Sequence, residues 1–185
     1  MSKSRPLCLI LDAGPIIGLH ELGAWKTFVE RYEVVVPQLV LDDEALFHSK
    51  DAATGHSEPI LLAADVGAGR LLVAAASLTA ISRVASRFTD AIELHDGELE
   101  ALALLTQDES YVGHVFCSAD GAAIEGACML GLADRCMSLE ELLGMVGLGR
   151  QVSWRFTKGF RSVTSVRAES GLSPASGLQT ERGAA

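Results

Sequence analysis

Apolar and polar positions alternate along the chain in two rhythms. Short apolar runs predict strands, and segments whose apolar residues recur every three or four positions predict helices. The expected strands are 7–11, 33–36, 71–75, 114–117 and a weaker one at 133–136. The expected helices are 15–21, 25–31, 38–47, 78–87, 97–106, 119–130 and 138–145. Strands separated by helices are typical of βαβ units, so we predict an α/β fold with a central parallel sheet.

Two acidic residues stand at the ends of predicted strands. In LILDAGPII, Asp12 ends an apolar run and is followed at once by Gly14 and Pro15. In FCSADGAAIEGACMLGL, Asp120 follows a strand and opens a helix. Taken alone, the first fits a turn and the second fits a helix N-cap. The carboxyl ends of parallel strands meet at one edge of a sheet, where binding sites form, so a shared site is the other interpretation.

Helical periodicity singles out two further acids. Each residue of an α-helix turns by about 100°, so sequence position predicts the face on which a side chain lies. In the segment 38–47, Asp43 falls in the middle of the apolar stripe. In the segment 97–106, Glu98 lies on the apolar face, whereas Glu100 is about 200° away and is expected to face solvent. A buried carboxylate is costly unless it is paired or binds a metal ion.

The four acids together favour a cation site. Singly, the two helical acids are explained by ion pairs with one of three arginines: Arg31, Arg83 or Arg87. No basic residue lies within the four segments that contain these acids, 9–17, 38–47, 97–106 and 116–132. The negative charge of a joint cluster would therefore not be neutralised by these segments. Oxygen ligands of this kind suit a hard divalent cation, Mg²⁺ or Mn²⁺.

Charge is divided unevenly along the chain. The net charge is −9, but residues 1–149 carry −13 and residues 150–185 carry +4. An acidic domain is not typical of a protein that coats nucleic acid without sequence preference. We therefore predict a domain over 1–149 and a basic C-terminal extension over 150–185. After about residue 170 the extension is Ser-, Gly-, Ala- and Pro-rich, which predicts a frayed tail.

The polar residues 48–58 predict a loop.

Basic and aromatic residues are interleaved in the extension, in GRQVSWRFTKGFRSVTSVR. This pattern suits phosphate contacts combined with base stacking. The candidate RNA-binding residues are Arg155, Lys158 and Arg161. The alternation of Val152, Trp154 and Phe156 equally predicts an edge strand that packs on the body, and the two interpretations are compatible.

Cysteine spacing and hydropathy bear on the compartment. The four cysteines show no CxxC spacing, which favours reduced thiols over a disulfide or metal role. No apolar run approaches the roughly 18 residues that a membrane helix needs. Asp12 interrupts the first apolar run before it can act as a signal peptide. We expect a cytoplasmic protein with no membrane association.

Four motifs resemble those of PIN-domain proteins, in the same order and over residues 7–147. LDAGPIIGLHELGAWKTFVERYEVVVPQLVLDD resembles the opening of the family, with an acid six residues after the strand-ending proline. DGELEALALL resembles the central helix, and FCSADGAAIEGACMLGL resembles the later segment in which a hydroxyl residue and an acid precede a helix. SLEELL resembles the closing helix.

The resemblance implies a Rossmann-like three-layer sandwich around a central parallel sheet. It places the metal-binding and catalytic acids at Asp12, Asp43, Glu98 and Asp120, with Ser118 in support. Asp43 stands where glutamate is usual in the family. PIN domains act as metal-dependent nucleases, often on RNA, leaving 5′-phosphate and 3′-hydroxyl ends. Many bacterial members are VapC-type toxins held by an antitoxin.

We therefore expect a single-domain, Mg²⁺- or Mn²⁺-dependent endoribonuclease, the toxin of a toxin–antitoxin pair. The expected partners are RNA, an antitoxin protein and a second copy of the chain in a homodimer. The alternative is a non-catalytic PIN-like module that binds RNA or a protein. A nucleotide-binding or phosphotransfer domain comes third, because the glycine stretches DVGAGRL and GLGR lack the G-x-G-x-x-G and P-loop patterns.

Overall fold

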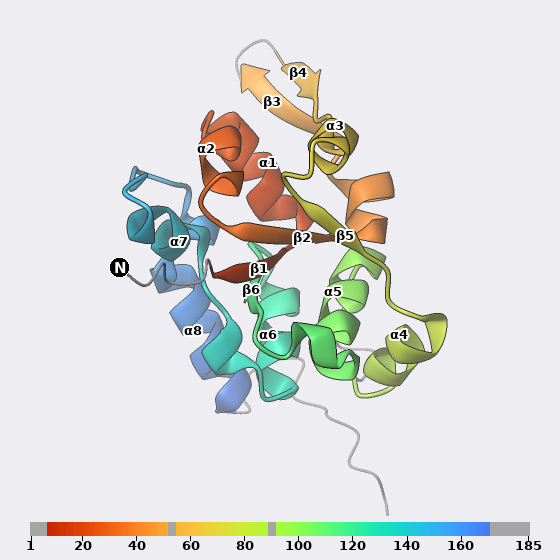
Figure 1. The fold of residues 1–185 in the computed structure, drawn as a ribbon. Coiled ribbons are helices and arrows are strands. Elements are labelled where there is room, and N and C mark those ends of the chain that lie inside the picture. The colour runs from red at the N-terminus through yellow and green to blue at the C-terminus, as the bar shows by residue number, and fades with distance from the viewer. Residues whose placement is uncertain (1–6, 52–54, 89–91, 171–185) are drawn as a thin grey trace, which may run out of the picture.

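Four parallel strands form the centre of the protein. The computed structural model describes residues 7–51, 55–88 and 92–170. The main sheet has the order β5-β2-β1-β6, and every pairing in it is parallel (Figure 1). Its strands are β1 (Cys8–Leu11), β2 (Glu33–Pro37), β5 (Leu72–Ala74) and β6 (Val115–Cys117). The predicted α/β fold with a parallel sheet is confirmed.

Helices cover both faces of this sheet, as Figure 1 shows. The helices are α1 (Ala13–Glu21), α2 (Trp25–Val29), α3 (Leu62–Gly67), α4 (Leu78–Ala85), α5 (Asp96–Gln107), α6 (Gly121–Met129), α7 (Leu139–Met145) and α8 (Lys158–Glu169). Leu9 and Leu11 of β1 pack with α1, α2 and α7 in one apolar cluster. Ile10 faces the other way and packs with α4, α5 and α6. Strand β1 is therefore apolar on both faces, which explains its continuous apolar sequence.

Three expected elements differ from the prediction. The segment 38–47 is not an α-helix, because it contains a π-helical turn, η1 (Val40–Glu44), closed by a hydrogen bond of 2.9 Å from Ala45 N to Val40 O. The expected loop 48–58 contains a hairpin of β3 (Phe47–Asp51) and β4 (His56–Pro59). The weak strand at 133–136 is a 3₁₀ turn, η3 (Ala133–Arg135), with a single bridge from Cys136 to Phe116. A second 3₁₀ turn, η2 (Glu109–Tyr111), precedes β6.

The C-terminal segment packs on the domain, although not as the edge strand that its alternation predicted. It forms a 3₁₀ turn, η4 (Trp154–Phe156), followed by α8. Phe156 is 5% exposed and lies so close to Gly18 of α1 that a Cβ there would be 2.7 Å from the Phe156 ring. The contacts of Phe156 and α8 tie residues 154–169 to the body. Residues 171–185, where the frayed tail was expected, lie outside the described residues.

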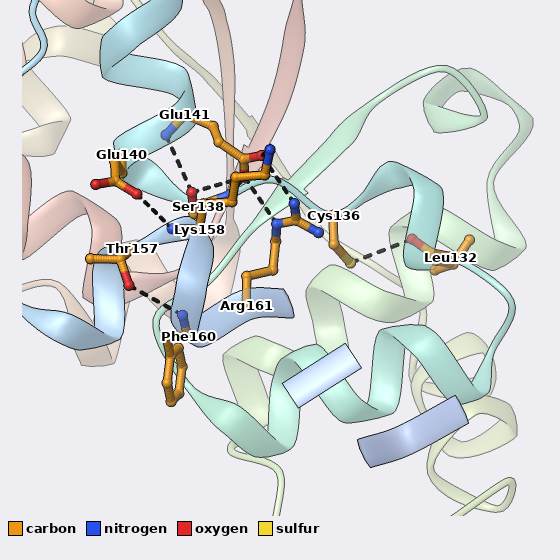
Figure 2. Close-up of polar contacts among 9 residues, drawn as sticks. All are labelled: Leu132, Cys136, Ser138, Glu140, Glu141, Thr157, Lys158, Phe160 and Arg161. Atoms are coloured by element: carbon orange, nitrogen blue, oxygen red, sulfur yellow. Dashed lines mark hydrogen bonds and ion pairs between the residues drawn. The ribbon is translucent and has the colours of Figure 1, made fainter. Parts of the chain in front are cut away.

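An ion pair fixes α8 to α7. The Arg161 guanidinium donates two hydrogen bonds to the Glu141 carboxylate, at 2.9 and 3.0 Å (Figure 2). The backbone N–H of Lys158 donates to Glu140 at 2.8 Å, also drawn in Figure 2. Arg161 thus has a structural role.

The cysteines and the lengths of the helices bear on two predictions from the sequence, that of reduced thiols and that of no membrane helix. None of the four cysteines, all within the described residues, forms a disulfide. Within residues 7–51, 55–88 and 92–170, every helix is too short or too polar to span a bilayer.

Candidate functional site

Ser118 joins the two acids at the carboxyl edge of the sheet. Asp12 follows β1 and caps α1, where its Oδ1 accepts a hydrogen bond of 2.7 Å from Ala13 N. Asp120 caps α6 in the same way, through a hydrogen bond of 2.7 Å from Ala122 N. The Ser118 hydroxyl donates to Asp12 Oδ2 at 2.7 Å and accepts from Asp120 N at 3.0 Å. Both acids are therefore N-caps and also neighbours, as the shared-site interpretation expected.

Glu98 lies in the first turn of α5 and is held there by the backbone. Its Oε2 accepts a hydrogen bond of 2.9 Å from His95 N. The side chain is only 3% exposed, which confirms the predicted inward face. The His95 ring lies close by, with Nδ1 at 3.7 Å from Glu98 Oε2.

Glu44 is the fourth carboxylate of the site and was missed by the helical-face argument. It ends the π-helical turn η1, and its Oε1 accepts a hydrogen bond of 3.0 Å from Gly97 N. This bond ties the segment after β2 to the first turn of α5. The acid type was a usable signal, because the family resemblance calls for glutamate at this point and the residue after Asp43 is one.

Asp43 is exposed and does not line the site. Its predicted inward face rested on 3.6 residues per turn, which a π-helical turn does not keep, because its hydrogen bonds span five residues instead of four. The neighbouring Glu44 is half-buried and takes the position expected for Asp43.

Glu100 is also placed differently from the prediction, since it is 2% exposed instead of facing solvent. Its carboxylate accepts hydrogen bonds from Leu39 N at 2.7 Å and from Ala76 N at 3.1 Å. These bonds link α5 to the segments that follow β2 and β5. Glu100 is absent from the lining of the site, so its role is structural.

The four acids open onto one cleft of about 300 Å³. It is lined by acids, small residues and two potential cations: Asp12, Ala13, Gly14, Glu44, His95, Glu98, Ala119, Asp120 and Arg155. Arg155 comes from η4, is exposed, and lies over the ring of Phe156 at 4.9 Å from its centroid. Of the three basic residues predicted to bind RNA, Arg155 is the one in the cleft lining. Small residues leave room between the carboxylates.

Burial and mutual repulsion shape the electrostatics of the cleft. Burial raises the pKa of Asp12 to about 6, and the charges of Glu44 and Asp120 add to this while the Ser118 hydrogen bond opposes it. Burial also raises the pKa of Glu98 to about 7, with the charges of Asp12 and Asp120 adding to the shift. Burial is the largest cause of both shifts, and the charges of the neighbouring carboxylates add to it.

The donor set fits a hard divalent cation. Hydrogen bonds hold Glu44, Glu98 and Asp120 through one carboxylate oxygen each, and this leaves the second oxygen of each as a candidate ligand. Carboxylate oxygens are the ligands that Mg²⁺ and Mn²⁺ prefer. The acids are not tightly clustered, because among the described residues the one group of three ligand atoms within 4.8 Å of one another lies elsewhere. A cation between the acids would offset the mutual repulsion of their negative charges.

Comparison with known proteins adds no assignment: no protein-family model matches this chain, and no curated protein matches it in sequence.

Proposed function

We propose that the protein is a PIN-like, divalent-metal-dependent endoribonuclease and that the cleft is its active site. The observation that carries this is the convergence of four carboxylates from four separate parts of the chain. Asp12 follows β1, Glu44 ends η1, Glu98 lies in the first turn of α5 and Asp120 follows β6, yet all line one cleft. Acids that converge on a cleft are typical of functional sites, and here burial raises the pKa of Asp12 and of Glu98.

The residues of the cleft would have separate roles in phosphodiester hydrolysis. The four carboxylates would hold the cation, and Ser118 orients Asp12 and the backbone of Asp120 toward one another. A divalent cation bound there would activate a water molecule and neutralise charge on the attacked phosphate and the leaving oxygen. Arg155 offers the cleft a guanidinium that suits a phosphate oxygen of the substrate.

The alternative is a PIN-like module that binds RNA or a protein without cleaving RNA. The spacing of the carboxylates favours it to some degree, because no three of their oxygens meet within 4.8 Å in the described part of the chain. The toxin role, with its antitoxin and homodimer, is supported by the motif resemblance over residues 7–147 alone.

Cleavage and cation binding together test the proposal. The full chain is incubated with a fluorescently labelled single-stranded RNA and Mn²⁺ or Mg²⁺, and Mn²⁺ binding is measured by calorimetry. We expect cleavage that stops with a chelator and falls by about 100-fold or more in Glu98→Gln, beyond the loss typical of outer-shell partners. Mn²⁺ binding without cleavage of any RNA supports the binding module. A folded protein that binds no Mn²⁺ overturns the proposal.

A further inference from the structure

Three metal-ligating side chains form a row at the amino ends of neighbouring strands. In the sheet register Ile10 pairs with Val35 on one side and with Phe116 on the other, and all three side chains lie in the same apolar cluster. Side chains two residues apart in a strand share a face. Two residues before these three are Cys8, Glu33 and His114, and Cys8 is itself the register partner of Glu33. The row is therefore set by the register of the sheet.

Each member of this row offers a different ligand atom, and these atoms lie within 4.8 Å of one another. A tetrahedral Zn²⁺ site with bonds of about 2.0–2.3 Å separates its ligands by about 3.3–3.8 Å. Side-chain rotations that move the ligand atoms by about 1 Å would therefore suffice to close the site around an ion. Glu33 is exposed and Cys8 is half-buried, so an ion can reach the row from solvent.

His114 is held in place by its surroundings. It is 9% exposed, and its ring meets that of Tyr111 edge-on at 5.0 Å between centroids. Its backbone N–H donates to Tyr111 O at 3.0 Å, and its carbonyl accepts from Arg135 Nε at 2.9 Å. A fixed imidazole loses little freedom when it binds a metal ion.

We infer that Cys8, Glu33 and His114 form a second metal site, selective for a borderline transition-metal ion such as Zn²⁺. Thiolate and imidazole ligands select such ions, whereas the carboxylates of the cleft suit Mg²⁺ or Mn²⁺. Three protein ligands leave a fourth position for water or another donor.

This site lies at the opposite edge of the sheet from the acidic cleft and does not depend on the proposed function. The cleft follows the carboxyl ends of β1 and β6, whereas the row precedes or begins β1, β2 and β6. An ion there would join three adjacent strands that are far apart in sequence. Because the ion would bind the folded chain and not the unfolded chain, it would raise the unfolding temperature.

Cobalt spectroscopy tests the assignment on the full chain. Co²⁺ is titrated in the presence of excess Mg²⁺, which occupies oxygen sites without competing for thiolates. We expect a thiolate-to-cobalt charge-transfer band that Zn²⁺ abolishes by displacement. Cys8→Ser removes the band, whereas Cys128→Ser, at another half-buried cysteine, retains it. Glu33→Gln weakens Zn²⁺ binding by about tenfold or more.

Circular dichroism and thermal unfolding of the metal-free variants exclude loss of fold as the cause. Glu33 is exposed, so its substitution leaves the core unchanged and keeps the test valid if Cys8→Ser misfolds. The absence of a thiolate band in the wild type, a band that survives Cys8→Ser, or Zn²⁺ affinity unchanged in Glu33→Gln overturns the inference.

Discussion

The Glu44 carboxylate lies directly against the backbone of Gly97. Its Oε1 accepts the Gly97 N–H at 3.0 Å, and a Cβ built on Gly97 would lie 2.6 Å from Glu44 Oε2 and 2.6 Å from Val40 Cγ2. No side chain fits this gap without displacing one of the acids of the cleft. Glycine at position 97 is therefore what allows η1 and α5 to approach so closely.

Gly97→Ala is expected to destabilise the protein by about 1–3 kcal/mol, as overpacking does. Gly144→Ala in α7 is the matched control, because a Cβ there meets nothing within 4 Å. That control should gain up to about 1 kcal/mol from helix propensity. Urea unfolding measures both changes. Equal effects of the two substitutions would show that the space at Gly97 is not restrictive.

Glu44→Gln is expected to weaken Mn²⁺ binding and cleavage strongly, whereas Asp43→Asn changes neither. The reason is that the π-helical turn directs Glu44 to the cleft and leaves Asp43 exposed. Each substitution removes one charge from adjacent residues, so a general electrostatic effect would appear in both. Calorimetry and RNA cleavage make the comparison. A greater loss in Asp43→Asn would restore the α-helical phase predicted from sequence.

Glu98→Gln and Glu100→Gln should separate activity from stability. Glu98→Gln removes one of several repelling charges, so the cation-free protein becomes no less stable at pH 8 while cleavage is lost. Glu100→Gln places an amide NH₂ against one of two backbone donors, Leu39 N or Ala76 N. An unsatisfied buried donor costs about 1–3 kcal/mol. Thermal unfolding and cleavage are measured on both variants. Comparable stability would contradict the structural role of Glu100.

The contribution of Asp12 and Glu98 to the stability of the cation-free protein is expected to fall as pH rises from about 4 to about 7. The pKa of Asp12 rises from 3.8 to about 6 on folding, and that of Glu98 rises from 4.5 to about 7. At these two groups the folded protein binds more protons than the unfolded chain in this window, so their contribution to the free energy of unfolding decreases with pH. Melting temperatures in a chelator at pH 5 and pH 8, compared between the wild type and Glu98→Gln, measure the contribution of Glu98.

The matched variant for this pH dependence is Glu98→Gln, which should remove the part of the fall that Glu98 contributes. Cations bind the deprotonated carboxylates, so added Mn²⁺ should stabilise the protein more at pH 8 than at pH 5. A stabilisation by Mn²⁺ that is greatest at pH 5 would be incompatible with binding at these acids.

Sequence patterns within a few residues predicted the positions of those acids that depend only on local secondary structure. Asp12 and Asp120 were found because a strand end and a helix start are both visible in the sequence around them. The π-helical turn has no comparable signal, so the 3.6-residue period selected Asp43 in place of Glu44. Glu100 was misplaced because α5 is buried on more than one face, and the segments at Leu39 and Ala76 that cover it are distant in sequence.

The C-terminal segment shows the same limit. Alternating apolar residues predicted an edge strand, but Phe156 instead fills the space over Gly18, and α8 pairs with α7 through Arg161 and Glu141. Both contacts join positions more than 15 residues apart in the sequence, and periodicity carries no information about them.

Arg155 and Arg161, which flank Phe156 and Lys158, are expected to have different roles. Arg155→Ala is expected to weaken RNA binding and to reduce the salt slope of log affinity by roughly 0.7, the value for one phosphate contact on a single strand. Its stability should change little, because the side chain is exposed and lines the cleft. Arg161→Ala should leave the salt slope unchanged and lower stability, because it leaves Glu141 without its guanidinium partner.

Fluorescence anisotropy with a labelled RNA at several salt concentrations gives the slopes, and urea unfolding gives the stabilities. The binding measurements are made in a chelator so that cleavage does not interfere. Lys158→Ala is the control for a general loss of positive charge, since its side chain is 65% exposed, its ammonium lies 3.9 Å from Glu141, and it does not line the cleft. If Lys158→Ala and Arg155→Ala reduce the salt slope equally, RNA follows the whole basic segment and the cleft arginine has no special role in binding.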